Sequence, residues 1–209
     1  MNVTPRIRLP FFLALSVLSL PACALSGGAI EGQVLEEGTH KPVAEALVVV
    51  KWVGSVSKFV DSQSVCVHVE SAVTDNEGRY RTPSWSAPST VGPEILVSRL
   101  IPVFTAYKPA TRQVEKETDF PLYLKPFTGG RGERIKYLSR LSGVARCGES
   151  GDSKKNLLPL YRALLDEAKS IANTTVEEKK TVEFLLYELE IVELGYEQAT
   201  KRHLVRPGY

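Results

Sequence analysis

The first half of the chain has the hydrophobic pattern of short β-strands. Apolar and polar residues alternate over Ile30–Val34 and again over Cys66–Val73, as they do in strands with one buried face. Val43–Val53 is instead dense in β-branched and small residues, which is typical of a strand in a protein core. Further strands are expected at Arg79–Thr82, Ile95–Tyr107 and Phe120–Leu124. Short strands with regular turns and no helical period predict an antiparallel β-sandwich.

Two polar segments separate some of these strands. Asp75-Asn76-Glu77-Gly78 predicts a tight turn, because glycine accepts the positive φ of such a turn and the Asp and Asn side chains bond the local backbone. Thr82–Pro93 is rich in proline and serine, which predicts a loop around Trp85.

After Pro126 the hydrophobic period changes to that of amphipathic helices. The apolar positions of Glu133–Ala145 lie three residues apart and predict a short helix. A second helix is expected from Asn156, where the apolar residues follow the i, i+3, i+4, i+7 rule. Those residues are Leu157, Leu160, Tyr161, Leu164, Leu165, Ala168, Ile171 and Ala172.

A third helix is expected to begin at Thr175, because Thr175 and Glu178 have the spacing of a capping box. This helix should run to about Lys201 and form a helical hairpin with the second one. The chain is therefore expected to be α+β, with a β-sandwich over residues 29–126 and a helical region over residues 127–209 packed on it.

The N-terminus has the pattern of a secretion leader. Arg6 and Arg8 precede the apolar stretch Leu9–Leu20, which is too short to span a bilayer as a stable anchor. Leu20-Pro21-Ala22-Cys23 then resembles the bacterial lipobox, in which the cysteine receives the lipid. The alternative is an ordinary signal peptide with a chance cysteine at its end.

The lipobox predicts cleavage before Cys23, acylation of that cysteine and an acylated tether over residues 23–28. The membrane lipid would then be the first partner of the protein. Ala24 follows the cysteine where an aspartate usually retains Gram-negative lipoproteins in the inner membrane. We therefore expect an outer-membrane location, facing the periplasm or the cell surface.

Charge excludes one class of function. The chain has 26 basic and 24 acidic residues, and loss of Arg6 and Arg8 with the leader leaves 24 of each sign. A protein that binds nucleic acid needs clustered positive charge to displace counterions from phosphates. A nucleic-acid partner is therefore not expected.

Three segments in this order resemble the carboxypeptidase regulatory-like domain. They are Ile30–Val34, Pro42–Val50 and Thr74–Tyr80, which are similar to the family's G-x-V strand, its P-x-x-x-A-x-V-x-V strand and its T-D-x-x-G-x-(F/Y) hairpin. Similarity extends over about residues 29–110, although the usual Gly-Tyr near the end is absent. The resemblance implies a transthyretin-like sandwich of about seven strands and a non-catalytic accessory role, with no catalytic residues to transfer.

Cys66 and Cys147 are the cysteines that remain after Cys23. An oxidising compartment favours a disulfide between them, and two buried free thiols are the alternative.

The sequence offers no catalytic or metal-binding motif, and no cofactor is expected. His40, His68 and His203 are scattered and lack the spacing of metal ligands, and the Asp75–Gly78 turn has too few oxygens for calcium. Tyr80 and Trp85 are the speculative ligand-binding residues, because exposed aromatic rings on a loop can stack on a sugar or grip a peptide. A hydrophobic plug beneath the loop is the alternative for both.

Two functions therefore remain open. The first is a membrane-anchored envelope lipoprotein with a non-catalytic binding or structural role and an envelope protein or glycan as partner. The second is a peptidase accessory or small hydrolase whose site is assembled from distant residues.

Overall fold

The computed structural model describes residues 24–57, 62–88, 100–115, 120–147, 151–171 and 175–206. Within these ranges the fold is α+β, with nine strands in three sheets followed by four α-helices. The predicted order of a β part followed by a helical part is confirmed. Residues 1–22 and Cys23, the expected leader and acylation site, lie outside the described residues.

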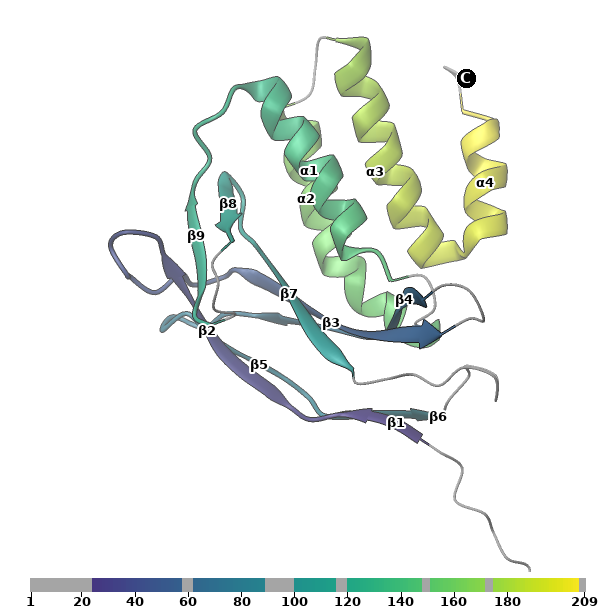
Figure 1. Ribbon diagram of the computed structural model, residues 1–209. Helices are drawn as coiled ribbons and strands as arrows, with labels where there is room; N and C mark the ends of the chain where they lie inside the picture. The colour runs from purple at the N-terminus through teal and green to yellow at the C-terminus, as the bar shows by residue number, and fades with distance from the viewer. Residues whose placement is uncertain are drawn as a thin grey trace, which may run out of the picture.

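The strands form two larger sheets and one small one (Figure 1). The strands are β1 Ala24–Gly27, β2 Ile30–Glu36, β3 Leu47–Ser57, β4 Ser62–Val73, β5 Arg79–Thr82, β6 Trp85–Pro88, β7 Ile101–Tyr107, β8 Thr111–Val114 and β9 Leu122–Pro126. The sheet orders are β5-β2-β9-β8, β4-β3-β7 and β1-β6. The strand count exceeds the expected seven, partly because β1 and β6 pair with each other as an additional sheet.

Three observations correct the sequence-based expectations for the β part. Residues 24–27, expected to be tether, form β1, whose backbone pairs with β6. Trp85 lies in β6 and not in a loop. The sheets are not purely antiparallel, because β2 and β9 run parallel. A parallel pair needs a long crossover, and β3 to β8 supply it here.

The β4-β3-β7 sheet is the middle of three layers (Figure 1). Val48, Val50 and Trp52 of β3 pack toward the other large sheet, in a buried cluster with Val34 and Leu124. On the opposite face of β3, Val49 belongs to the buried cluster of the helices. Burial on both faces explains why the β3 sequence is nearly continuous in apolar residues and does not alternate.

The helices cover the outer face of this middle sheet (Figure 1). They are α1 Arg131–Ala145, α2 Leu158–Ile171, α3 Val176–Leu194 and α4 Tyr196–Leu204, with a 3-10 helix over Gly151–Leu157. Most periodic residues of α2 are buried as predicted, namely Leu160, Tyr161, Leu164, Leu165 and Ala168, whereas Ile171 is half-buried and Ala172 lies outside the described residues. The capping box of Thr175 and Glu178 is present. The third helix does not reach Lys201, because Gly195 breaks it with φ of 84°.

The turn at Asp75–Gly78 is confirmed. Gly78 has φ of 70°. The Asp75 carboxylate accepts hydrogen bonds from the backbone N–H groups of Glu77 (3.0 Å) and Arg79 (2.8 Å). A side chain at Gly78 would also meet the Val34 carbonyl oxygen, 2.5 Å from the position of a Cβ. Glycine is therefore required by both the backbone conformation and the space.

Candidate ligand-binding groove at the strand edges

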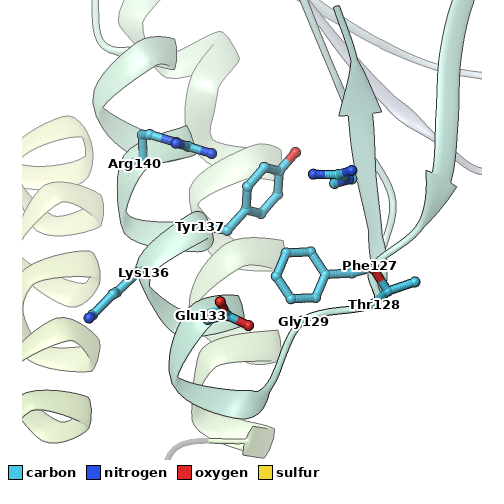
Figure 2. Close-up of a pocket in the computed structure, with 8 residues that line it drawn as sticks. Phe127, Thr128, Gly129, Glu133, Lys136, Tyr137 and Arg140 are labelled. Atoms are coloured by element: carbon cyan, nitrogen blue, oxygen red, sulfur yellow. The ribbon is translucent and has the colours of Figure 1, made fainter.

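A groove lies where the edge strands of both large sheets approach helix α1. β8 is the last strand of one large sheet, and β7 is the last strand of the other. Two adjoining cavities of about 590 and 630 Å³ share Arg112, Tyr137 and Arg140. We call this depression the edge groove; Arg112, Phe127, Tyr137, Arg140, Leu141 and Val144 are among its lining residues. Figure 2 shows the Tyr137 ring of α1 between the side chains of Arg140 and Phe127.

Side chains form hydrogen bonds with several outward backbone groups of the two edge strands. The Tyr137 hydroxyl accepts a hydrogen bond from Gln113 N–H (3.1 Å), and the Arg134 guanidinium donates to the Thr111 carbonyl. On β7, Ala106 N–H donates to the Gln113 side chain (2.7 Å). An exposed edge with free backbone groups is a site of unwanted strand pairing. Here α1 and one glutamine cover it, and the groove walls are side chains.

A buried ion pair fixes α1 against the strands behind the groove. Arg134 and Glu167 of α2 make two parallel contacts, at 2.8 and 2.7 Å. Glu167 also accepts hydrogen bonds from the Tyr107 hydroxyl (2.6 Å) and from Ala110 N–H (3.0 Å). The network therefore ties two helices to the β7–β8 turn.

The network shifts two pKa values. Burial alone would raise the pKa of Glu167, but the hydrogen bonds from Arg134, Tyr107 and Ala110 lower it below its usual value. Burial raises the pKa of Tyr107, and the neighbouring Glu167 raises it further. Glu167 is therefore ionised and Tyr107 neutral at pH 7, the states in which the hydroxyl donates to the carboxylate.

Positive charge gathers around the groove. Within the described residues, Arg112, Lys136 and Arg140 make no ion pair. The Arg140 guanidinium lies 5.7 Å from the centre of the Tyr137 ring, which leaves its charge available to an anion. The acidic lining residues are Glu115 and Glu133, and Glu133 accepts a hydrogen bond from Gly130 N–H (2.8 Å).

Apolar side chains form part of the lining between the cations. Phe104, Val114 and Leu141 line it with the more exposed Val103 and Val144, which are 38% and 50% exposed. A groove lined by both cations and apolar side chains can bind an anionic group and hold an apolar one beside it.

The residues that the sequence proposed for ligand binding lie elsewhere. Tyr80 and Trp85 are 4% and 7% exposed and belong to the core between the sheets. The Trp85 ring stacks on His68 (centroids 4.1 Å apart) and meets Trp52 edge-on. Faces covered in this way cannot stack on a ligand, so the structure argues against the ligand hypothesis and agrees with the hydrophobic plug.

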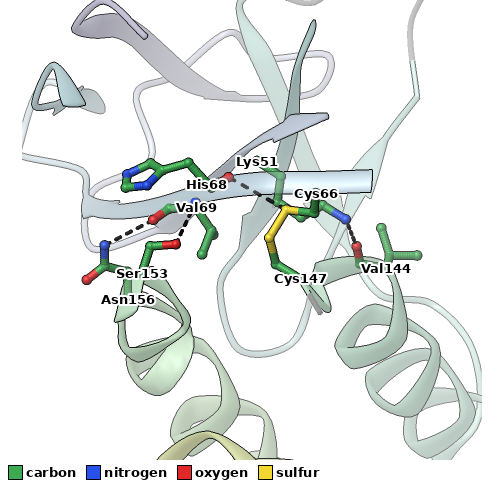
Figure 3. The surroundings of a disulfide bond; sticks show 8 residues. All are labelled: Lys51, Cys66, His68, Val69, Val144, Cys147, Ser153 and Asn156. Atoms are coloured by element: carbon green, nitrogen blue, oxygen red, sulfur yellow. Dashed lines mark hydrogen bonds between the residues drawn. A yellow bond between two sulfur atoms is a disulfide. The ribbon is translucent and has the colours of Figure 1, made fainter. Parts of the chain in front are cut away.

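The predicted disulfide between Cys66 and Cys147 is present, with Cα atoms 5.2 Å apart (Figure 3). It joins β4 to the residue that follows the end of α1 by two positions. Beside it, buried Lys51 donates to the Val144 carbonyl in the last turn of α1, where a cation is favoured. Burial lowers the pKa of Lys51.

A β-bulge makes this disulfide possible. Trp52 pairs with His68 and Val53 with Cys66, so Val67 has no partner in the register. Regular alternation would place Cys66 on the face of His68, which packs against Trp85 between the sheets. The extra residue turns Cys66 to the face of Val69, which is the helix side.

His68 does not contribute to the groove. Its Nε2 lies 2.8 Å from Glu70, whose other oxygen accepts from the Asn156 amide (3.0 Å). Within the described ranges, no group of three or more His, Cys, Asp or Glu residues is placed to hold a metal ion. Among the helices that the structure describes, none has both the length and the apolar character needed to cross a bilayer.

Sequence reasoning missed the edge groove. Lys136 and Arg140 stand four residues apart on α1, which places them on one helix face, but this spacing is also typical of any solvated helix surface. Only the docking of α1 against β8 brings Arg112 to the same place.

Comparisons with protein-family models, with curated proteins and with solved structures give no match. The resemblance to the carboxypeptidase regulatory-like domain therefore stays a prediction.

Proposed function

We propose that this protein is a lipid-anchored, non-catalytic binding protein of the bacterial cell envelope, and that the edge groove is its binding site. The observation that carries the proposal is the groove itself, in which three cations without ion pairs within the described residues surround aromatic and aliphatic side chains. Long basic side chains left without partners beside exposed valines favour contact with another molecule.

The anchor rests on the lipobox-like Leu20-Pro21-Ala22-Cys23. The disulfide supports a compartment outside the cytoplasm, because such bonds persist in oxidising environments. Ala24 favours the outer membrane over the inner one.

The position of β1 predicts how the anchored protein would be oriented at the membrane. β1 begins at Ala24, the residue directly after the proposed lipid attachment site, and pairs with β6. A lipid on Cys23 would therefore hold the β1–β6 end of the sandwich at the bilayer surface with almost no tether. The helical layer, at the far side of the molecule in Figure 1, would face away from the membrane.

The carboxypeptidase regulatory-like fold is part of the same proposal. Two facing sheets and a glycine turn at Asp75–Gly78 support it. That family is an accessory module, in agreement with a role in binding.

Photo-crosslinking in living cells tests the proposal. A benzoylphenylalanine placed at Val144, in the groove, should capture an envelope component, while the same residue at Tyr196 on α4 should not. Both positions are exposed, at 50% and 69%, so exposure alone does not separate them. Equal capture at both positions, or none at Val144, would contradict the proposal.

A further inference from the structure

We infer that the ligand of the edge groove is an acidic peptide segment with apolar side chains, held by side-chain contacts and not by β-strand addition. The inference rests on the proposed function and names the class of ligand.

The positive charge of the groove favours a negatively charged ligand. Arg112, Lys136 and Arg140 make no ion pair within the described residues, and together with Lys125 they outnumber the two lining acids, Glu115 and Glu133. Arginine guanidinium groups match the planar geometry of carboxylates and can bind them through two parallel hydrogen bonds. Aspartate or glutamate side chains are therefore suited to the rim.

The apolar side chains of the lining restrict the class of ligand further. Val103 and Val144 remain 38% and 50% exposed beside the cations. A free phosphate or an acidic polysaccharide would satisfy the arginines but would leave these valines against water or hydroxyl groups. A peptide places aliphatic side chains within a few ångströms of its carboxylates, so one segment can meet both requirements. The two adjoining depressions, of about 590 and 630 Å³, are partly open to solvent and have room for side chains of such a segment.

The strand edges decide how the peptide is held. A peptide that extends a sheet needs the free N–H and C=O groups of an edge strand. On β8 the Thr111 carbonyl and the Gln113 N–H are bonded to Arg134 and Tyr137, and on β7 Gln113 holds Ala106 N–H. Strand addition would first have to break these hydrogen bonds. We therefore expect the peptide to be bound by the side chains that line the groove.

Fluorescence anisotropy with the full-length acylated protein in detergent tests the inference. The probe is a labelled nine-residue peptide of alternating glutamate and leucine. Three comparison peptides replace glutamate by glutamine, glutamate by lysine, or leucine by serine. Only the glutamate–leucine peptide should bind well, and raised salt should weaken it.

Variants place the binding in the groove. Arg112→Gln combined with Arg140→Gln should weaken binding by roughly tenfold or more. Val144→Asp should weaken it through both charge and lost apolar contact. Arg202→Gln removes an exposed cation of α4 and should leave the affinity unchanged. Circular dichroism melting curves confirm that each variant is folded.

The outcomes separate this inference from the proposed function. Equal binding of the serine or lysine peptide, tighter binding of polygalacturonate oligomers, or indifference to the groove variants would overturn the peptide assignment. If Val144 crosslinks an envelope component in cells while no acidic peptide binds, the groove is a binding site for another ligand. If neither occurs, both proposals fail.

Discussion

Replacing Arg134 by methionine should destabilise the protein strongly, because it removes one member of a buried ion pair. The Arg134 and Glu167 side chains are 6% and 10% exposed and lie 2.7 Å apart. Methionine keeps much of the volume of arginine but leaves the Glu167 carboxylate without its cation. Breaking a buried pair on one side costs about 3–5 kcal/mol. The Thr111 carbonyl also loses a donor, but this residue is only half-buried and water can replace it.

Urea unfolding at pH 7, followed by circular dichroism, measures the effect. With a slope near 2 kcal/mol per molar urea, a loss of about 4 kcal/mol moves the midpoint down by roughly 2 M. The matched control is Lys201→Met, which breaks an exposed pair with Glu197 at the same distance of 2.7 Å. An exposed pair contributes about 0–1 kcal/mol, so this control should barely move the midpoint. Equal shifts for both variants would refute the role assigned to the buried network.

The same network predicts a dependence on pH. The pKa of Glu167 is lower in the folded protein than its ordinary value of 4.5, so the unfolded chain takes up the proton first as pH falls. The stability due to this carboxylate is therefore fully present above 4.5 and is lost as pH falls through the folded pKa. Glu167→Gln should lower stability at pH 7 and remove this part of the acid dependence. An unchanged slope of stability against pH below 4.5 would contradict the prediction.

Three further predictions concern the anchor and the core. Cys23→Ser should abolish incorporation of labelled palmitate and release the protein from membranes; a variant that still labels would refute the lipobox. Replacing Cys66 and Cys147 by serine should cost up to about 4.5 kcal/mol of unfolding free energy, because the bond closes a loop of 81 residues. In the unmutated mature protein, denatured without reduction, no free thiol should titrate. Two free thiols would show that the bond is absent. Leu164→Ala should lower the free energy of unfolding by about 2–5 kcal/mol, because Leu164 is fully buried. Leu186→Ala should lower it by less, because Leu186 is half-buried. Similar small losses for both variants would mean that the helices pack differently.

Local signals in the sequence predicted the local structure well. The period of α2, the Thr175 capping box and the Asp75–Gly78 turn depend on residues within a few positions of each other, and each is confirmed. The largest error in a helix boundary, at the end of the third helix, also had a local signal, since Gly195 interrupts the apolar period of α3.

Features that depend on distant residues were predicted less well. The sequence around Trp85 suggests a loop, but pairing of β6 with β1 makes it a strand and buries the ring. Gly27 allows this burial, because a Cβ there would collide with the rings of Trp85 and Trp52. The edge groove likewise needs α1 to dock against β8, and no spacing within either element specifies that contact.

The disulfide was predicted correctly, but the prediction did not explain how Cys66 comes to face Cys147. Counting cysteines and assuming an oxidising compartment pairs Cys66 with Cys147, yet the alternation of β4 places Cys66 on the wrong face. The bulge at Val67 reverses that face and turns the sulfur toward the helices. Deleting Val67 should therefore leave the disulfide in place, because Cys66 and His68 then become neighbours in a regular strand and still point to opposite faces. Free thiols in the denatured, unreduced deletion variant would contradict this account of the bulge.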